Sequence, residues 1–359
     1  FFGPFFMDSV AQRWALVAGN VILFALFFCA LRRRRWHSSS TVTRAAIDIG
    51  SGMTKVLVAE VDLENNNLVR VLISDDAEVM LRRDLLQQNK QGGRKSFSLA
   101  IQAQLYDQLA AYKSIAQAAG ATQYAAVATA AFRETDNGED FLRHVNAELG
   151  IPVEIIGQEF EGQLGFYTAK VVCHDVAEDN LVAWDSGGGS FQLTSRVGNE
   201  NVMYGYDIGS SVATTALVEA VQGKLYVGQS PNPVSMEEAQ GLFDYLIDRL
   251  PDPPLWLRAK VLRKEVTVAG IGGNNCIFNL ALQVIGRLQF SDKQVWSHVQ
   301  SLANQTDAQL SWYPQKDMVL PKLILMYSVM RKVGIAKVRY CPCNGNTQGM
   351  LLIDYFWPK

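Results

Sequence analysis

Two aspartates of this 359-residue chain each follow an apolar run and precede a cluster of glycines. They lie in the segments Asp48-Ile49-Gly50-Ser51-Gly52 and Asp185-Ser186-Gly187-Gly188-Gly189. Glycine turns let phosphate oxygens approach the backbone N–H groups, because no side chain stands in the way. A carboxylate beside them suits Mg²⁺, which binds one or two carboxylates together with water and phosphate oxygens. The two loops therefore predict a phosphate-binding site with Mg²⁺, or another divalent cation, held by Asp48 and Asp185.

A third glycine turn follows in the second half of the chain, at Gly270-Ile271-Gly272-Gly273. One glycine-rich hairpin is a weak signal, whereas loops repeated at matching positions are a stronger one. We expect the substrate to contact the following loop residues: Gly50, Ser51, Gly52, Gly187, Gly188, Gly189, Ser190, Gly272 and Gly273.

The order of elements around the first loop repeats around the second, which indicates an internal duplication. In both places the pattern predicts strands around a glycine turn and then a helix. Aligning residues 46–52 with residues 183–189 matches the aspartate and two of the glycines. We therefore predict an α/β fold of two related lobes, residues 44–175 and 176–359, with a cleft between them.

Apolar periodicity and turn residues give the bounds of these elements. The predicted strands are 45–49, 55–61, 68–81, 124–131, 153–156 and 265–269. The predicted helices are 98–120, 138–149, 210–221, 235–250, a helix from Asn274, 291–303 and 320–333. The proline-rich stretch 251–254 is predicted to be a surface loop.

A separate apolar segment, residues 14–31, precedes the lobes, and Asn20 is its one polar residue. Four arginines, residues 32–35, follow it directly, whereas Arg13 is the one basic residue before it. A helix of about 20 apolar residues spans the hydrocarbon core of a bilayer. Because the positive charge follows the segment, we expect a single-pass transmembrane anchor, a basic and polar linker at 32–43, and lobes in the cytoplasm. A buried hairpin helix and an organelle-targeting sequence are the alternatives.

The overall composition argues against several other classes of protein. The formal charge of −2 and the pI near 6.2 lack the basic excess of a nucleic-acid binder, so we expect no nucleic-acid duplex as a partner. The five cysteines are odd in number and irregularly spaced, which favours a reducing compartment. The four histidines lack the spacing of zinc ligands. The sequence leaves open whether the chain forms a homodimer.

Two further stretches resemble a known family. They are ATAAFRETDNGEDFLRHVNAELGIPVEIIGQEFEGQLGF, at residues 128–166, and the loop WDSGGGSFQL, at 184–193. Both, and their order, resemble the exopolyphosphatase / guanosine pentaphosphate phosphatase family of the actin, sugar-kinase and heat-shock ATPase superfamily. The resemblance runs across most of the chain after Arg44. It implies two actin-like (ribonuclease H-like) lobes and removal of a terminal phosphate by an in-line water.

The resemblance also implies a catalytic glutamate just after the predicted strand 153–156, where this chain has Glu161. A carboxylate early in a helix between the lobes can take a proton from water if burial raises its pKa toward neutrality. Glu159 points to a different side of the same helix and is the weaker candidate. The alternative for Glu161 is an exposed carboxylate in its favoured first turn.

Arg133 matches the phosphate-contacting arginine of the family. A planar guanidinium can hold phosphate oxygens through two parallel hydrogen bonds. The alternative is an ion pair with Glu134 or Asp136.

Three positions depart from the family pattern. Gly52-Met53-Thr54 stands where the family continues with Asn-Ser, and we expect the Thr54 hydroxyl to take over in substrate binding. Gln192 replaces a glutamate and Thr347 an arginine. A glutamine after the second loop is also typical of the related apyrases, so hydrolysis of nucleoside tri- and diphosphates is the second hypothesis. A sensor that binds polyphosphate or nucleotide without turnover is the third.

The leading hypothesis is therefore a membrane-tethered, magnesium-dependent hydrolase. Its substrate would be the terminal phosphoanhydride of polyphosphate or of a polyphosphorylated guanosine nucleotide.

Overall fold

A computed structural model describes residues 41–90 and 95–357 of the chain. The predicted transmembrane segment, 14–31, lies outside the described residues. In the part that the structure describes, no helix is long and apolar enough to cross a membrane. The residues from Thr41 onward form a unit of their own.

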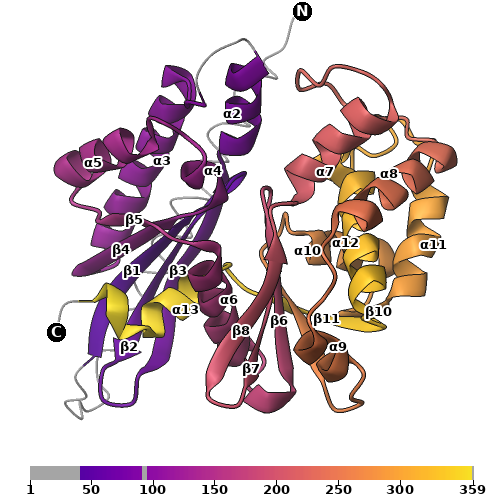
Figure 1. Cartoon of the computed structure of the whole chain (residues 1–359). Coiled ribbons are helices and arrows are strands. Elements are labelled where there is room, and N and C mark those ends of the chain that lie inside the picture. Colours follow the sequence, from indigo (N-terminus) through magenta and orange to yellow (C-terminus); the bar gives the residue numbers. More distant parts are fainter. Residues whose placement is uncertain (1–40, 91–94, 358–359) are drawn as a thin grey trace, which may run out of the picture. The chain divides into compact units, whose positions relative to one another are not determined.

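The first of two sheets has five strands in the order β3-β2-β1-β4-β5 (Figure 1). These strands are β1 (Thr41–Ile49), β2 (Met53–Asp62), β3 (Asn67–Glu78), β4 (Gln123–Ala128) and β5 (Val153–Ile155). β1, β2 and β3 are antiparallel, whereas β4 runs parallel to β1 and β5 parallel to β4. Side chains of β1 alternate between two cores, with Ala45 and Ile47 in one and Ala46 in the other. Asp48 therefore lies on the face of Ala46.

The second sheet has six strands in the order β10-β11-β9-β6-β7-β8. They are β6 (Leu181–Ser186), β7 (Phe191–Val197), β8 (Glu200–Tyr206), β9 (Thr267–Gly272), β10 (Gln289–Ser291) and β11 (Lys337–Pro342). β6, β7 and β8 are antiparallel, and β9 and β11 continue the sheet in parallel. From β8 to β11 this repeats the order and direction of the first sheet. The predicted α/β fold with two related sheets is confirmed.

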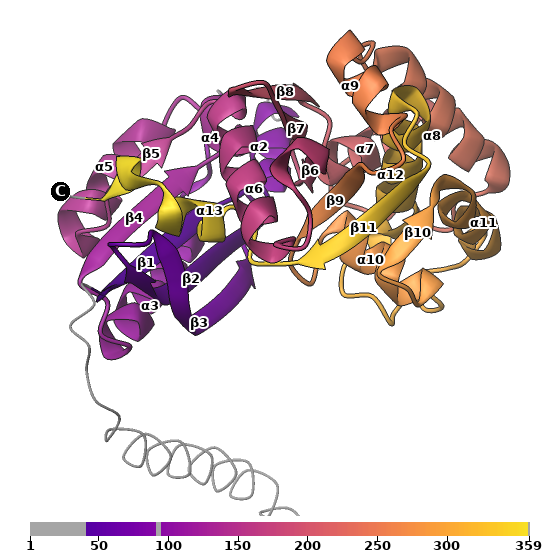
Figure 2. The same ribbon diagram turned by 90° about the horizontal axis from the view of Figure 1, so that it is seen from below.

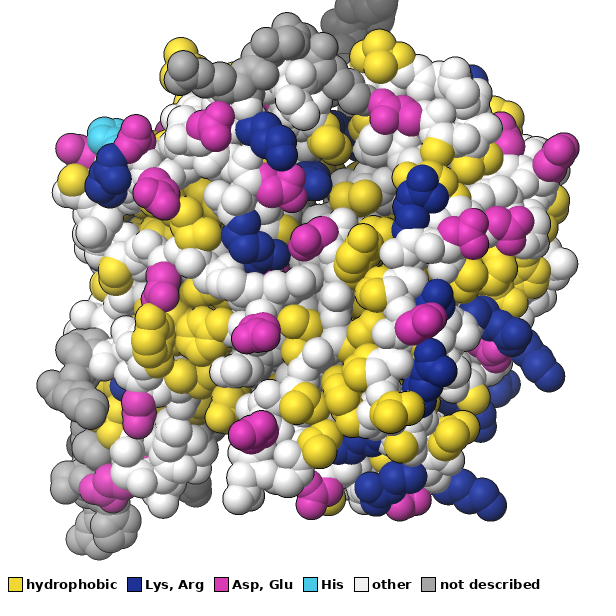
Figure 3. Space-filling view, viewed as in Figure 1, with side chains coloured by type: hydrophobic (Ala, Val, Ile, Leu, Met, Phe, Trp, Pro, Cys, Tyr) yellow, Lys and Arg dark blue, Asp and Glu magenta, His cyan; other side chains and the backbone are white. Residues whose placement is uncertain are grey.

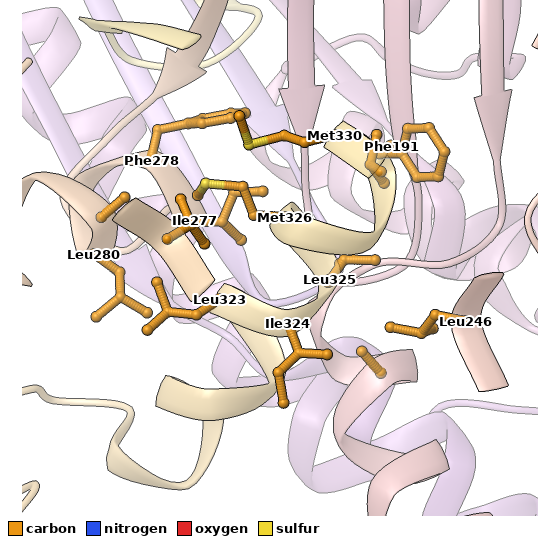
Figure 4. Packing of buried hydrophobic residues seen from close by; sticks show 14 of the residues in the cluster. Phe191, Leu246, Ile277, Phe278, Leu280, Leu323, Ile324, Leu325, Met326 and Met330 are labelled. Atoms are coloured by element: carbon orange, nitrogen blue, oxygen red, sulfur yellow. The ribbon is translucent and has the colours of Figure 1, made fainter. Parts of the chain in front are cut away.

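On the face of each sheet that points away from α6 (Gln158–Val172), a group of helices packs against the strands (Figure 1). Beside the first sheet lie α2 (Leu81–Lys90), α3 (Leu99–Ala118), α4 (Ala130–Arg133) and α5 (Gly138–Leu149). Beside the second lie α7 (Ser210–Ala216), α8 (Met236–Arg249), α9 (Leu255–Val261), α10 (Ile277–Ile285), α11 (Asp292–Leu302) and α12 (Val319–Val333). Figure 4 shows Leu323, Met326 and Met330 of α12 packed near Ile277 and Phe278 of α10. Burial of these apolar side chains stabilises the second lobe.

The helix α6 (Gln158–Val172) lies between the two sheets (Figure 2). Its Leu164 packs with residues of the first sheet, and its Phe166 with residues of the second. In β6, Ala183 also faces α6, and Asp185 lies on the same side as Ala183. The alternation of β1 and β6 therefore directs Asp48 and Asp185 toward α6.

The end of the chain returns to the first sheet. Met350 and Leu351 of α13 (Thr347–Leu352) pack with Trp357 against β1 and β2. The Arg44 guanidinium donates to the Leu351 carbonyl at 2.9 Å and lies 4.7 Å from the centre of the Trp357 ring. The last residues of the predicted second lobe, 176–359, thus contribute to the core of the first.

Most predicted element bounds agree with the structure within a few residues. One strand ends earlier than expected, because 124–131 was predicted and β4 ends at Ala128. Ala128 pairs with Ile49, the last residue of β1, so the strand has no partner beyond that point and α4 begins instead. The helix expected from Asn274 begins at Ile277, with Cys276 as its N-cap.

Candidate active site

The three predicted glycine turns meet around one cavity of about 90 Å³, which residues of both lobes line. The lining includes the predicted residues Gly50, Ser51, Gly52, Gly187, Gly188, Gly189, Ser190, Gly272 and Gly273, together with Asp48, Asp185 and Glu161. The predicted residues Thr54 and Arg133 are not part of the lining. The fold thus brings loops that are far apart in the sequence to one place.

The two aspartate loops approach each other closely across the cavity. A Cβ atom on Gly189 would lie 2.9 Å from the Ala130 Cβ and 2.9 Å from the Ser51 Oγ. A Cβ atom on Gly188 would lie 3.4 Å from the Ser51 Cβ. Any side chain at Gly189 would therefore push the loops apart, which gives this glycine a steric role besides the predicted contact with substrate.

Lys55 is a cation that forms an ion pair with Asp48 and acts on the charge of Asp185, and its role was not predicted from the sequence. The hairpin register sets Lys55 opposite Asp48, and its Nζ lies 3.7 Å from the Asp48 Oδ2. Burial acts to lower the pKa of Lys55, but the carboxylates of Asp48 and Asp185 hold it above its ordinary value. Burial raises the pKa of Asp185 to about 6, against the influence of Lys55. The spacing of seven residues from Asp48, read with hairpin geometry, would have found Lys55.

Glu161 projects from the first turn of α6 into the cavity wall, and 7% of its surface is exposed. Arg133 Nη1 donates to Glu161 Oε2 at 2.9 Å and to the Ile156 carbonyl at 3.0 Å. Burial raises the pKa of Glu161 to about 7, with Arg133 opposing the rise and Asp185 and Asp48 adding to it. The alternative of an exposed carboxylate is wrong for Glu161.

Arg133 therefore pairs with Glu161, and the expected alternative partners are not used. Glu134 instead pairs with Arg82 of α2. The Nη2 atom of Arg133 is buried and has no hydrogen-bond partner. Arg133 thus orients the Glu161 carboxylate and keeps one N–H group free.

The loop before α13 holds the first aspartate from the other side. The backbone N–H and the side-chain amide of Asn346 both donate to Asp48 Oδ2 at 3.4 Å. Gly345 has a φ of 64°, and a Cβ atom there would lie 2.5 Å from the Lys55 Nζ and 3.1 Å from the Asp48 Oδ2. Asn346 gave no signal in the sequence, because nothing local connects it to a residue about 300 positions away.

Several buried polar atoms at the site have no hydrogen-bond partner in the described part of the chain. They are Asp48 Oδ1, Ser51 Oγ, Arg133 Nη2, Ser186 Oγ and Asn346 Oδ1. Because buried polar groups are normally hydrogen-bonded, these atoms mark positions for water, a metal ion or a ligand. The oxygens of Asp48 and Asn346 suit Mg²⁺. These residues therefore fit a metal ion that completes its coordination with water or with oxygens of a ligand.

No cluster of three or more His, Cys, Asp or Glu side chains arranged to hold a metal ion occurs in residues 41–90 and 95–357. Mg²⁺ needs no such cluster, since it usually keeps several waters and binds through one or two carboxylates plus substrate phosphates.

The three positions that depart from the family pattern have different surroundings. Thr54 is fully buried in β2, away from the cavity, and its hydroxyl has no partner. Gln192 stands opposite Asp185, as Lys55 stands opposite Asp48, and donates to Ser190 Oγ at 3.1 Å. Thr347 is buried at the start of α13 and donates to the Asn344 carbonyl at 2.8 Å.

A second, basic hollow lies on the surface near α9. Figure 3 shows Lys and Arg side chains gathered at the lower right of the molecule. The hollow is lined by Arg196, Lys260 and Arg263. Arg196 pairs with Glu178, Arg263 pairs with Glu265, and Lys260 donates to the Arg196 carbonyl. Since these cations already have partners, the cavity between the lobes is the stronger candidate for phosphate.

Comparison with known proteins confirms the expected resemblance. Residues 56–217 match a model described as the Ppx/GppA phosphatase family. The matched region contains the second aspartate loop, Glu161 and Arg133.

Two curated relatives match parts of the chain. A bifunctional 3-dehydroquinate synthase/phosphatase of Fusobacterium nucleatum is 26% identical over 154 residues, which cover 42% of this chain and 22% of that protein. Exopolyphosphatase 1 of Mycobacterium tuberculosis is 30% identical over 89 residues, which cover 25% of this chain and 26% of that protein. The chain thus spans about a quarter of the length of these relatives.

The fold also matches a solved structure, the Aquifex aeolicus member of the Ppx/GppA protein family. The TM-score is 0.64 at 20% identity, and the match covers 87% of this chain and 97% of that one. This likeness shows that the two chains share a fold.

Proposed function

We propose, from the resemblance to the Ppx/GppA phosphatase family, that this chain hydrolyses the terminal phosphoanhydride of polyphosphate or of a polyphosphorylated guanosine nucleotide. The observation that carries the proposal is the position of Glu161. Its buried carboxylate, with a pKa raised to about 7, stands in the wall of a cavity that two glycine loops also line.

Glu161 acts as the general base of this reaction. Its ionised carboxylate accepts a proton from a water molecule, whose oxygen forms a bond to the terminal phosphorus. The P–O anhydride bond on the opposite side breaks, and its electron pair leaves with the shortened substrate. The products are orthophosphate and a chain shorter by one phosphoryl group. A pKa of about 7 suits this role, because a base is most effective when its pKa lies near the working pH.

The residues around Glu161 stabilise the phosphoryl group. Backbone N–H groups of the loops at 50–52 and 187–189 surround the phosphoryl oxygens, where negative charge must be stabilised in the transition state. Lys55 supplies positive charge in the cavity wall, and Arg133, which lies outside the lining, holds the Glu161 carboxylate in position. Asp48 and Asp185 would hold Mg²⁺, which supplies neutralisation of the phosphate charges when bound.

The size of the cavity favours a narrow substrate. Pockets that bury drug-sized ligands typically enclose about 300–1,000 Å³, whereas this one has a volume of about 90 Å³. A linear chain of phosphoryl groups fits such a space better than a nucleoside does.

The proposal is tested by following phosphate release from polyphosphate, ATP and guanosine pentaphosphate, with and without Mg²⁺. We expect release from polyphosphate or the guanosine nucleotide that needs the metal. Glu161→Gln should lower kcat by about 10²- to 10⁴-fold, the usual contribution of a general base. Glu159→Gln is the matched control, because Glu159 lies in the same turn but is exposed. Equal activity of the two variants would exclude the assigned mechanism, and release without metal would exclude the cofactor.

Apyrase-like hydrolysis is the second candidate function, and Gln192 beside the second loop is the observation that favours it. ATP and ADP cleaved faster than polyphosphate would decide for it. Tight binding of polyphosphate, without phosphate release from any of the substrates, would favour a sensor.

We further propose, on the sequence alone, that residues 14–31 anchor the protein in a membrane with the lobes in the cytoplasm. Sedimentation of the full chain with membranes, and its release by detergent but not by high salt, is the expected result. The control is a chain without residues 14–31, which should no longer sediment with membranes. Light scattering of the detergent-solubilised chain tests for a homodimer.

A further inference from the structure

Lys322 of α12 is a buried cation that neither the sequence analysis nor the mechanism uses. Its exposed fraction is 1%, and it lines the same cavity as the glycine loops. A buried ammonium group is costly unless an opposite charge or several acceptors stabilise it. The groups around the Lys322 ammonium therefore indicate its role.

Three neutral acceptors surround the Lys322 ammonium. Its Nζ donates to the Asn275 carbonyl at 2.7 Å, to the Tyr313 hydroxyl at 2.8 Å and to Gln315 Oε1 at 2.5 Å. No Asp or Glu of the described residues forms an ion pair with it. The nearest carboxylates, Asp317 and Glu78, act on it only at longer range.

Those two carboxylates are already engaged elsewhere. Asp317 pairs with Arg83 of α2 at 2.6 Å, and Glu78 accepts a hydrogen bond from the Gln315 amide at 3.2 Å. Burial consequently lowers the pKa of Lys322 to about 8. Because the neighbouring acceptors are neutral and both carboxylates are engaged elsewhere, a bound ligand is the most accessible anionic partner for Lys322.

Lys322 lies on α12, whereas Glu161 lies on α6, and both line the same cavity. Asn275, whose backbone carbonyl accepts one of the Lys322 hydrogen bonds, follows the third glycine turn. Its side-chain amide lies 3.8 Å from the Met53 sulfur beside the first loop. Glu161, the glycine turns and Lys322 thus line one and the same cavity.

We propose that Lys322 forms a second anion subsite, which binds a phosphoryl group on the leaving side of the bond that is cleaved. The subsite rests on the proposed function, because it assigns the terminal phosphoryl group to the glycine loops. A phosphate oxygen replaces Gln315 Oε1 as acceptor, since a side-chain amide can turn away while the Asn275 carbonyl stays in place. The subsite therefore favours phosphoanhydrides over phosphate monoesters, which lack a second phosphoryl group.

The test compares ligands with one and with three phosphoryl groups. Orthophosphate and inorganic tripolyphosphate are titrated calorimetrically into the full chain in detergent, in the Glu161→Gln background that does not turn over. Lys322→Met is then added. Because hydrogen bonds between charged groups contribute more than neutral ones, the tripolyphosphate Kd should rise about 10- to 100-fold. The orthophosphate Kd should stay within about threefold, a margin typical of an uninvolved site.

The matched control is Lys332→Met, which removes a positive charge from the same helix away from the cavity. Lys332 lies in the last turn of α12, and its Nζ is 3.2 Å from the Asp252 carboxylate. It should leave both Kd values unchanged. An equal loss for both ligands, or no loss for tripolyphosphate, overturns the subsite.

A second variant, Gln315→Glu, keeps Lys322 in place and gives it a fixed anionic partner. It should weaken tripolyphosphate in the same direction, and it decides the matter if Lys322→Met does not fold. Unchanged tripolyphosphate affinity in a folded Gln315→Glu variant overturns the subsite as well.

Guanosine triphosphate, titrated in parallel, identifies the source of the phosphoryl groups. Tighter binding of tripolyphosphate assigns the subsite to the inorganic chain, and tighter binding of the nucleotide assigns it to nucleotide phosphates. The outcome is separable from failure of the proposed function. If tripolyphosphate binding depends on Lys322 but the wild-type chain hydrolyses nothing, the subsite proposal stands and the proposed function falls. If the wild-type chain hydrolyses substrate but its affinity does not depend on Lys322, the proposed function stands and the subsite proposal falls.

Discussion

Replacing Glu161 by Gln should stabilise the protein at alkaline pH while it removes activity. Burial raises the pKa of this carboxyl from 4.5 to about 7 in the folded chain. A group whose pKa is higher when folded favours folding at low pH, and this contribution is lost as pH rises through the folded pKa. At about 1.4 kcal/mol per pKa unit, the shift corresponds to about 3 kcal/mol above pH 7. Glutamine cannot ionise and avoids this cost.

The expected gain is smaller than that limit, because Arg133 loses its charged partner in the variant. Arg133 keeps its hydrogen bond to the Ile156 carbonyl, so it is not left without a partner. We expect Glu161→Gln to exceed the wild type in free energy of unfolding by about 1–3 kcal/mol at alkaline pH. The difference should shrink as pH falls, because the wild-type carboxyl becomes neutral as well.

Urea unfolding across this pH range measures the difference, with Glu159→Gln as the exposed control. In parallel, the wild-type rate of phosphate release should fall as pH drops below about 7, because the base takes up its proton. A Glu161→Gln variant that is less stable than the wild type at alkaline pH would show that the carboxylate is a structural ion-pair partner. A flat rate profile through neutral pH would show that it is not the base.

Three further substitutions test the surroundings of Glu161. Arg133→Met should shift the fall in rate to higher pH, because Arg133 holds the pKa of Glu161 down; a pH profile of kcat that does not move would refute its positioning role. Lys55→Met should weaken orthophosphate binding about 10- to 100-fold, as expected for a lost charge-assisted hydrogen bond, and should raise the pKa of Asp185, which carboxyl NMR can follow. Gly345→Ala should lower the free energy of unfolding by about 1–2 kcal/mol, since the left-handed backbone disfavours a Cβ atom; an unchanged midpoint in urea would contradict this.

The sequence was informative wherever local geometry decides the outcome. Strand alternation and glycine turns depend on near neighbours in the chain, so Asp48 and Asp185 could be placed at strand ends. The duplication could be recognised because both halves repeat that local pattern. Glu161 was recognisable through the resemblance of residues 128–166 to a phosphatase family.

Asn346 could not be found from the sequence, because its partner lies far along the chain. Asn346 reaches Asp48 only because the end of the chain returns to the first sheet. Thr54 was expected to contact substrate, yet it is buried in β2 outside the cavity lining. Its position in the hairpin puts the neighbouring Lys55 beside Asp48 instead.

By itself the sequence determined the two related α/β lobes, the glycine loops with their aspartates, and the likeness to a phosphatase family. These depend on backbone preferences and on alternation over a few residues. Tertiary structure decided which charges share one cavity. The pairing of Arg133 with Glu161, the contact of Asn346 with Asp48 and the uncompensated Lys322 arise when α6, α12 and the chain end converge. Burial at that point sets the pKa values on which the chemistry depends, and burial is a property of the assembled lobes.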